Sequence, residues 1–120
     1  MVKLRKVRLL QEDAFLSDPS IIDSAERNLQ IAIQAVIDIG NHIAADMDLG
    51  TPRDYKEIFQ LLIRNNVIPE PLGAKLISMT DLQNILVHDY LEIDLRLIYR
   101  IIQGELDVFD EFIAATLKLI

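Results

Sequence analysis

Apolar side chains recur at every third or fourth position along most of the chain, which is the spacing of α-helices with one buried face. The longest such segment begins after Asp18, a predicted N-cap, with Pro19 at the first helical position, and runs to about Met47. Gly40 falls within its apolar stripe and predicts that another helix packs closely there. The stripe consists of Ile22, Ala25, Leu29, Ala32, Ile33, Val36, Gly40, Ile43, Ala44 and Met47.

Two shorter segments lie on either side of this long helix. Residues 2–15 predict a single first helix. After the long helix, Thr51 predicts an N-cap and Pro52 the first position of a helix that runs to about Asn65. The apolar positions are Leu4, Val7, Leu10 and Ala14 in the first segment, and Ile58, Phe59, Leu61 and Leu62 in the second.

Two more helical segments complete the chain. Pro71 opens one that runs towards His88, and Asp94 predicts the N-cap of a last segment that Gly104 divides in two. The first of these carries Leu72, Leu76, Met79, Leu82 and Leu86 at helical spacing. No segment alternates apolar and polar residues as a half-buried strand does. The sequence therefore predicts one all-α domain over residues 1–120, an antiparallel bundle of about five helices.

Composition adds an expectation about assembly. Of the 120 residues, 51% are apolar, which is a high share for a small domain that must expose much of its chain. The excess predicts that a second copy covers part of the surface, as in a homodimer. The chain has no cysteine, and no apolar run approaches the roughly 20 residues that cross a bilayer. We expect a cytoplasmic protein without a membrane partner.

The formal net charge of −7 argues against a broad nucleic-acid surface, which is usually basic. A nucleic-acid role would need a small local site or a groove built from two chains. The basic residues are uneven, since Lys3, Arg5, Lys6 and Arg8 fall within the first eight positions. They form a solvated first helix turn, an edge that meets an acidic partner, or an arm that contacts phosphate.

Several kinds of site are excluded by what the chain lacks. The two histidines, His42 and His88, have no second histidine at metal-ligand spacing, and the four glycines form no phosphate-binding loop. We therefore expect neither a metal nor a cofactor. His42 lies four residues after Asp38, a spacing that favours a surface ion pair. A solvated helix face is the expected role of the acidic residues Asp107, Asp110 and Glu111.

The stretch "DLQNILVHDY", residues 81–90, holds the most informative polar residues. On an ideal helix, Asn84 and His88 fall on the side opposite the apolar stripe and are neighbours one turn apart. Gln83 lies about 140° round the helix from His88, so the two side chains do not touch within one helix. They share a ligand only if it lies across the helix or if a second chain completes the site.

The whole chain resembles the HepT-like toxins of the HEPN superfamily. The resemblance is carried by "AERNLQIAIQAVIDIGNHI", "TPRDYKEIFQLL", "NVIPEPL" and above all "MTDLQNILVHDYLEID". The family form of the last string is approximately Met-x-x-x-Arg-Asn-Ile-Leu-Val-His-x-Tyr. Its asparagine, histidine and tyrosine are present here as Asn84, His88 and Tyr90.

The resemblance implies a helical homodimer whose motifs line a cleft between the subunits and form a metal-independent endoribonuclease. It implies that His88 is the general acid or base, with Asn84 beside it, and that position 83 holds the scissile phosphate. The implied partner is an MNT-type nucleotidyltransferase antitoxin of a type II toxin–antitoxin system. That enzyme would neutralise the toxin by transferring AMP to Tyr90, whose added negative charge would repel RNA.

Gln83 departs from this pattern, because the resemblance places an arginine there. Glutamine carries no charge and lacks the guanidinium fork, and losing such a contact typically costs on the order of 10²-fold or more in rate. Three explanations of this glutamine remain open. The motif has degenerated naturally, the variant was selected or engineered so that a toxic protein could be produced, or Arg96 or Arg100 supplies the missing charge. Three hypotheses follow: a HepT toxin whose nuclease activity Gln83 impairs, a non-catalytic binding module of a minimal nucleotidyltransferase, or a plain structural dimer.

Overall fold

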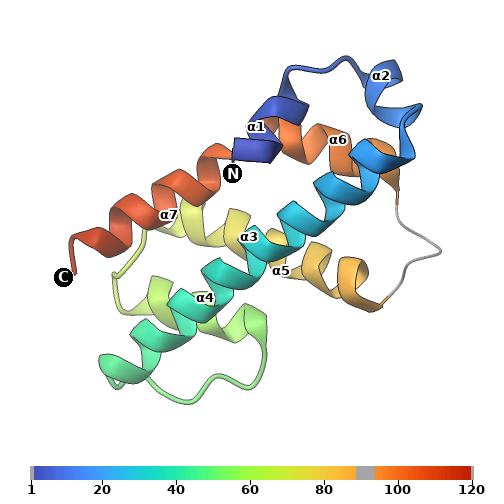
Figure 1. The fold of residues 1–120 in the computed structure, drawn as a ribbon. Coiled ribbons are helices and arrows are strands. Elements are labelled where there is room, and N and C mark those ends of the chain that lie inside the picture. The colour runs from blue at the N-terminus through green and yellow to red at the C-terminus, as the bar shows by residue number, and fades with distance from the viewer. Residues whose placement is uncertain (1, 89–93, 120) are drawn as a thin grey trace.

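The computed structural model describes residues 2–88 and 94–119. Within these ranges the chain forms helices and no strand, which confirms the predicted all-α class (Figure 1). The described helices are more numerous than the five expected, because two predicted segments are each divided. They are α1 (Val2–Arg8), α2 (Glu12–Leu16), α3 (Pro19–Asp46), α4 (Tyr55–Arg64), α5 (Glu70–His88), α6 (Leu95–Gly104) and α7 (Asp107–Leu117).

Helix α3 is the central element of the molecule. It runs diagonally across the other helices, and α1, α2, α4, α5 and α7 all pack against it (Figure 1). The side chain of Asp18 caps its N-terminus by accepting the backbone N–H groups of Ser20 and Ile21, as predicted. Its buried residues are Ala25, Leu29, Ile33, Val36, Ile37, Gly40 and Ala44. This stripe is the core against which the helix that carries the motif packs.

Gly40 is the point at which α3 and α4 approach each other. A Cβ atom at this position would lie 3.0 Å from Cγ2 of Ile58 and 3.3 Å from Cε1 of Phe59. Both of those residues belong to the buried face of α4, which confirms the apolar positions predicted for it. The predicted close packing at Gly40 is therefore confirmed, and a larger residue there would require the side chains of Ile58 and Phe59 to shift.

The predicted single helix over residues 2–15 is wrong, because the chain breaks between α1 and α2. The hydroxyl of Tyr99 donates to the carbonyl of Leu10, and Nε2 of Gln103 donates to the carbonyl of Arg8 at 2.9 Å. Helix α6 thus binds carbonyls that a continuous helix would use internally. The break also moves Phe15 into the core in place of Ala14, which is exposed.

The predicted start of α4 is also wrong. Asp54, not Thr51, is the N-cap, and its carboxylate accepts the backbone N–H of Glu57 at 2.8 Å. The Asp–x–x–Glu spacing that begins at Asp54 satisfies a free N–H group of the first turn directly. Asp94 caps α6 and Gly104 is its last residue, as predicted, whereas α5 begins at Glu70, one residue before the predicted Pro71.

Basic residues of α1 meet the acidic face of α7. Arg5 lies 2.5 Å from Asp110, and Arg8 lies 3.7 Å from Asp107. The acidic groups that these two arginines meet therefore belong to α7 of the same chain. The predicted ion pair of His42 has a different partner, since its Nε2 lies 3.1 Å from Asp46 and not beside Asp38.

Candidate functional site

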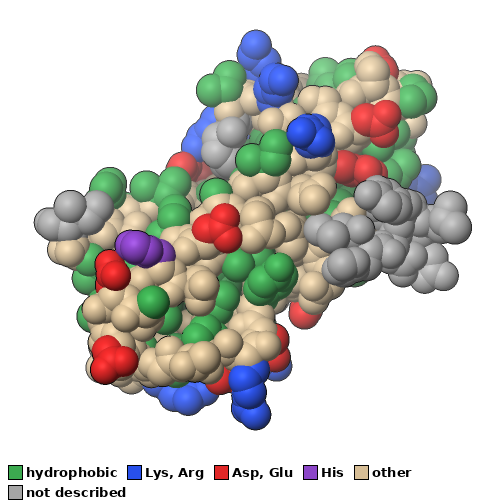
Figure 2. Space-filling view, turned by 60° about the horizontal axis from the view of Figure 1, so that its bottom comes forward, with side chains coloured by type: hydrophobic (Ala, Val, Ile, Leu, Met, Phe, Trp, Pro, Cys, Tyr) green, Lys and Arg blue, Asp and Glu red, His purple; other side chains and the backbone are tan. Residues whose placement is uncertain are grey.

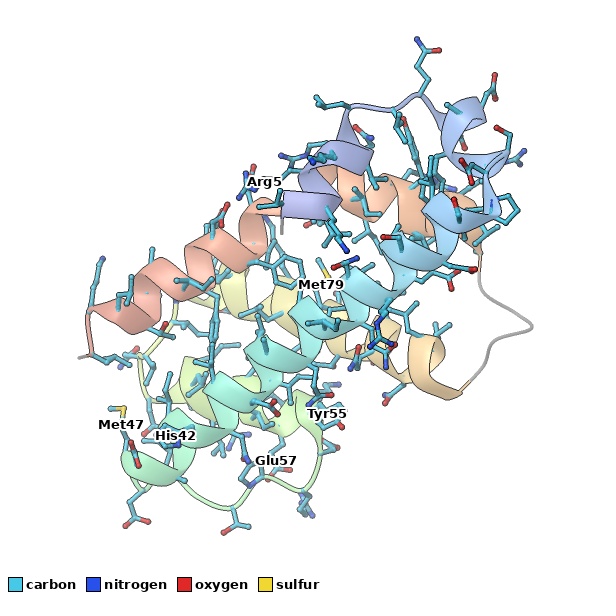
Figure 3. The ribbon with its side chains drawn as sticks, in the orientation of Figure 1. Arg5, His42, Met47, Tyr55, Glu57 and Met79 are labelled. Atoms are coloured by element: carbon cyan, nitrogen blue, oxygen red, sulfur yellow. The ribbon has the colours of Figure 1, made fainter. Side chains whose placement is uncertain are left out.

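Helix α5 presents the two faces predicted for it. Met79, Leu82 and Leu86 are buried against the core, whereas Asn84 is exposed. Figure 3 shows Met79 where α3 crosses α5. His88 is the last residue of α5, and only its place in the helix is described. Tyr90 lies outside the described residues.

Gln83 does not share the exposed face with Asn84. Its side chain is only 2% exposed. It comes four residues after Met79 and three before Leu86, so the helix turns it towards α3 with its buried neighbours. The residue at the family's arginine position therefore faces the protein interior in the single chain.

A short chain of hydrogen bonds leads from Gln83 to the surface. Nε2 of Gln83 donates to Oε1 of Gln34 at 3.0 Å, and Nε2 of Gln34 donates to a carboxylate oxygen of Asp38 at 2.9 Å. Gln34 is half-buried and Asp38 is exposed. The remaining polar atom, Oε1 of Gln83, is buried without a hydrogen-bond partner among the described residues. Such an atom is uncommon, because buried polar groups are nearly always paired.

The sequence pointed to Gln83, but it did not point to Gln34, and it paired Asp38 with His42 instead. The spacing of four residues between Gln34 and Asp38 places them on one face of α3. That spacing was a signal that they interact with each other. Nothing in the sequence showed that this face meets Gln83, because the crossing of α3 and α5 joins residues 49 positions apart.

Two hollows lie near these residues. One, of about 360 Å³, is bounded by Asn84 and its neighbours on α5 and by the start of α4. The other, of about 350 Å³, is bounded by Gln34 and Asp38 of α3. Tyr55, which Figure 3 shows at the start of α4, lines both hollows. Asn84 thus lines one hollow and Gln34, which accepts a hydrogen bond from Gln83, lines the other, whereas Gln83 itself lines neither.

The two hollows are lined by amides, carboxylates, the phenol of Tyr55, the hydroxyl of Thr80 and the cationic side chains of Arg53 and Lys56. No group of three or more potential metal ligands occurs among the described residues. Arg96, considered above as a substitute for the arginine, has its Nε 3.6 Å from Glu12 of α2. That contact directs it towards α2. None of the described helices is long and apolar enough to span a membrane.

The comparison with known proteins concerns nearly the whole chain. A family model described as Ribonuclease HepT-like matches residues 1–116. The mRNA nuclease HepT of Shewanella oneidensis is 41% identical over 99 residues, which are 82% of this chain and 74% of that protein. The tRNA nuclease HepT of Aphanizomenon flos-aquae is 32% identical over 91 residues, which are 76% of this chain and 62% of that one.

Solved structures of toxin–antitoxin complexes also resemble this chain. A tri-AMPylated HEPN toxin of Shewanella oneidensis in complex with an MNT antitoxin matches with a TM-score of 0.86 and 36% identity, over 97% of this chain and 89% of that one. A toxin–antitoxin complex with AMP-PNP matches with a TM-score of 0.87 and 34% identity, over 97% and 87% of the two chains. The family model and the sequence relatives show that the chain belongs to the HepT-like ribonuclease family.

Proposed function

We propose that this chain is the toxin of a HepT/MNT toxin–antitoxin pair and a metal-independent endoribonuclease that acts in the cytoplasm. The observation that carries the proposal is the match, over 97% of the chain, to a HEPN toxin held in complex with its MNT antitoxin. Two relatives, at 41% and 32% identity, are named as nucleases. These matches favour the toxin over the alternative of a non-catalytic module.

In the proposed reaction the 2′-oxygen of a ribose attacks the adjacent phosphorus, and the bond from phosphorus to the 5′-oxygen breaks. His88 takes the proton of the 2′-hydroxyl or gives one to the leaving 5′-oxygen. We expect Asn84, which is exposed and one turn from His88, to donate its amide N–H to a phosphate oxygen. Gln83 supplies no charge, so we expect slow cleavage.

Cleavage of RNA in EDTA tests this reaction. Slow cleavage that continues in EDTA and disappears in His88→Ala would support it, because a histidine mechanism needs no metal. Cleavage that EDTA abolishes, or that His88→Ala retains, would overturn it. Circular dichroism of the variant shows whether the helices have been kept.

We infer that two copies form the working cleft. Ile85 and Leu97 are 38% and 40% exposed, and they line a hollow between α5 and α6 next to the face that carries Asn84. Exposed apolar residues at such a position favour a partner surface. Figure 2 shows further exposed apolar side chains, which lie among charged ones on the face in view. A second copy over α5 and α6 would enclose RNA between the motifs of the two chains. Such a small local cleft is the kind of RNA site that a protein with a negative net charge needs.

The antitoxin is proposed to act on Tyr90. Its hydroxyl oxygen would attack the α-phosphorus of ATP in the transferase. The bond from this phosphorus to the oxygen that bridges to the β-phosphate would break, and pyrophosphate would leave. Support comes from the AMPylated state of the related toxin. Incubation with the cognate transferase and ATP should add one or more AMP masses, and Tyr90→Phe should add none. AMP on another residue, or an unchanged mass, would count against Tyr90 as the acceptor.

A further inference from the structure

We propose that Gln34 and Asp38 of α3 are positioning residues for the side chain at position 83, and that they form an acceptor site suited to a cation. This inference rests on the proposed ribonuclease function, and it identifies residues outside the motif that would govern it. It starts from the polar chain that joins Gln83 to Gln34 and Asp38. We call Gln34 and Asp38 together the α3 arm.

The first step concerns what Gln83 leaves unsatisfied. Its amide has a donor group and an acceptor oxygen. The donor is used on Gln34, while the buried acceptor has no partner among the described residues. An unpaired buried acceptor lowers stability, because its hydration is lost without replacement. Glutamine is thus an imperfect match to its surroundings here.

The second step concerns what the α3 arm offers. Towards Gln83 it presents the amide oxygen of Gln34, and behind that oxygen lies the carboxylate of Asp38. Both groups are acceptors, so the fitting side chain is one that has only donors. Arginine has five N–H donors and no acceptor, and it is longer than glutamine. At position 83 it would leave no unpaired oxygen and could reach towards Asp38.

The third step links this fit to the reaction. A guanidinium buried on the core side of α5 would need a counter-charge, and Asp38 is the carboxylate at the end of the hydrogen-bond chain. One edge of the guanidinium would bind the α3 arm, and its other N–H groups would remain for the phosphate. Asp38 and Gln34 line the hollow beside Tyr55, so a phosphate could approach from that side. The α3 arm would thus orient the charge without touching the substrate.

A melting experiment tests the α3 arm without any nuclease assay. The variants are Gln83→Arg, Asp38→Asn and their combination. The control, Asp46→Asn, removes another exposed carboxylate of α3, which pairs with His42. We compare changes in melting temperature relative to the parent chain. For the combined variant we expect a change about 4 °C or more lower than the sum of the changes in the two single variants, because the arginine loses its counter-charge. Additive shifts, or an equal effect of Asp46→Asn in the Gln83→Arg background, would overturn the proposal.

Kinetics in the Gln83→Arg background test the link to the reaction. Asp38→Asn should lower kcat by about tenfold to a hundredfold with a smaller change in KM, since it misplaces a charge that acts in the transition state. Asp38→Glu should restore part of the rate, and Asp46→Asn should leave it unchanged. An unchanged kcat in Asp38→Asn would contradict the positioning role. If Gln83→Arg cleaves no RNA, the proposed function fails, while the melting experiment still decides whether the α3 arm exists.

Discussion

At the scale of single residues, Gln83 shows how a helix position constrains chemistry. Its burial follows from the buried residues a turn before and after it, so any side chain at this position meets α3 first. A residue that must also reach a phosphate therefore needs length and a partner on α3. Glutamine has a partner in Gln34, but it lacks the length and the charge.

Glu26 gives a pH-dependent prediction. Partial burial in α3, with a smaller contribution from the carboxylate of Asp23, raises the pKa of Glu26 above its ordinary value of 4.5. The folded state therefore holds this proton more tightly than the unfolded state does. The contribution of Glu26 to stability is favourable below its ordinary pKa and is lost as pH rises through the raised one.

Glu26→Gln should therefore raise the melting temperature at pH 7, and the gain should vanish below pH 4.5. Thermal melts across this range check the prediction. Glu111→Gln, which changes an exposed carboxylate of α7, serves as the control and should show little gain at either pH. A gain for Glu26→Gln that is independent of pH would show that ionisation is not its cause.

At the scale of helices, close packing depends on small residues at particular crossings. A Cβ atom at Gly73 would lie 2.3 Å from Cδ1 of Ile63, whereas a Cβ atom at Gly104 would meet nothing within 4 Å. Gly73→Ala should cost about 1–3 kcal/mol in the free energy of unfolding, because α5 and α4 must separate or Ile63 must move. Denaturant unfolding measures this cost.

Gly104→Ala is the matched substitution in open space. It should be neutral or should stabilise by up to about 1 kcal/mol, because alanine favours the last turn of α6. Equal effects at the two glycines would contradict the packing account. The pair therefore separates steric crowding from helix propensity.

Local sequence signals predicted the starts of α3 and α6, whereas contacts between distant segments decided where the first helix breaks and which residues surround the site. Asp18 and Asp94 were predicted as caps because a cap needs only its own first turn. The break between α1 and α2 was not predictable, because it depends on Tyr99 and Gln103 of α6. In the candidate site, the exposed face with Asn84 followed from helix geometry. Its neighbours on α3 and α4 required the three-dimensional arrangement.

At the scale of the whole molecule, charge and apolar surface point to assembly. The chain carries a net charge of −7, and Arg5 and Arg8 of its basic N-terminus are engaged with α7. A single copy thus offers RNA little broad attraction. A cleft between two copies would concentrate polar groups from both motifs where one chain has few.

Ile85→Glu should disrupt the proposed dimer, because it places a charge within an apolar contact. Light scattering should give twice 13.7 kDa for the parent chain and 13.7 kDa for the variant. Leu9→Glu is the control. Leu9 follows the end of α1 and is 85% exposed, so a charge there should leave the dimer intact. A monomeric parent at micromolar concentration would contradict the dimer outright.

The central claim is that this chain has the architecture of a HepT ribonuclease and is limited by Gln83. The most direct measurement is the initial rate of RNA cleavage by the parent chain, by Gln83→Arg and by Gln83→Arg/His88→Ala. We predict that Gln83→Arg raises the rate on the order of 10²-fold or more, and that the added His88→Ala abolishes it. A Gln83→Arg protein as slow as its parent, or a double variant that still cleaves, would contradict the account.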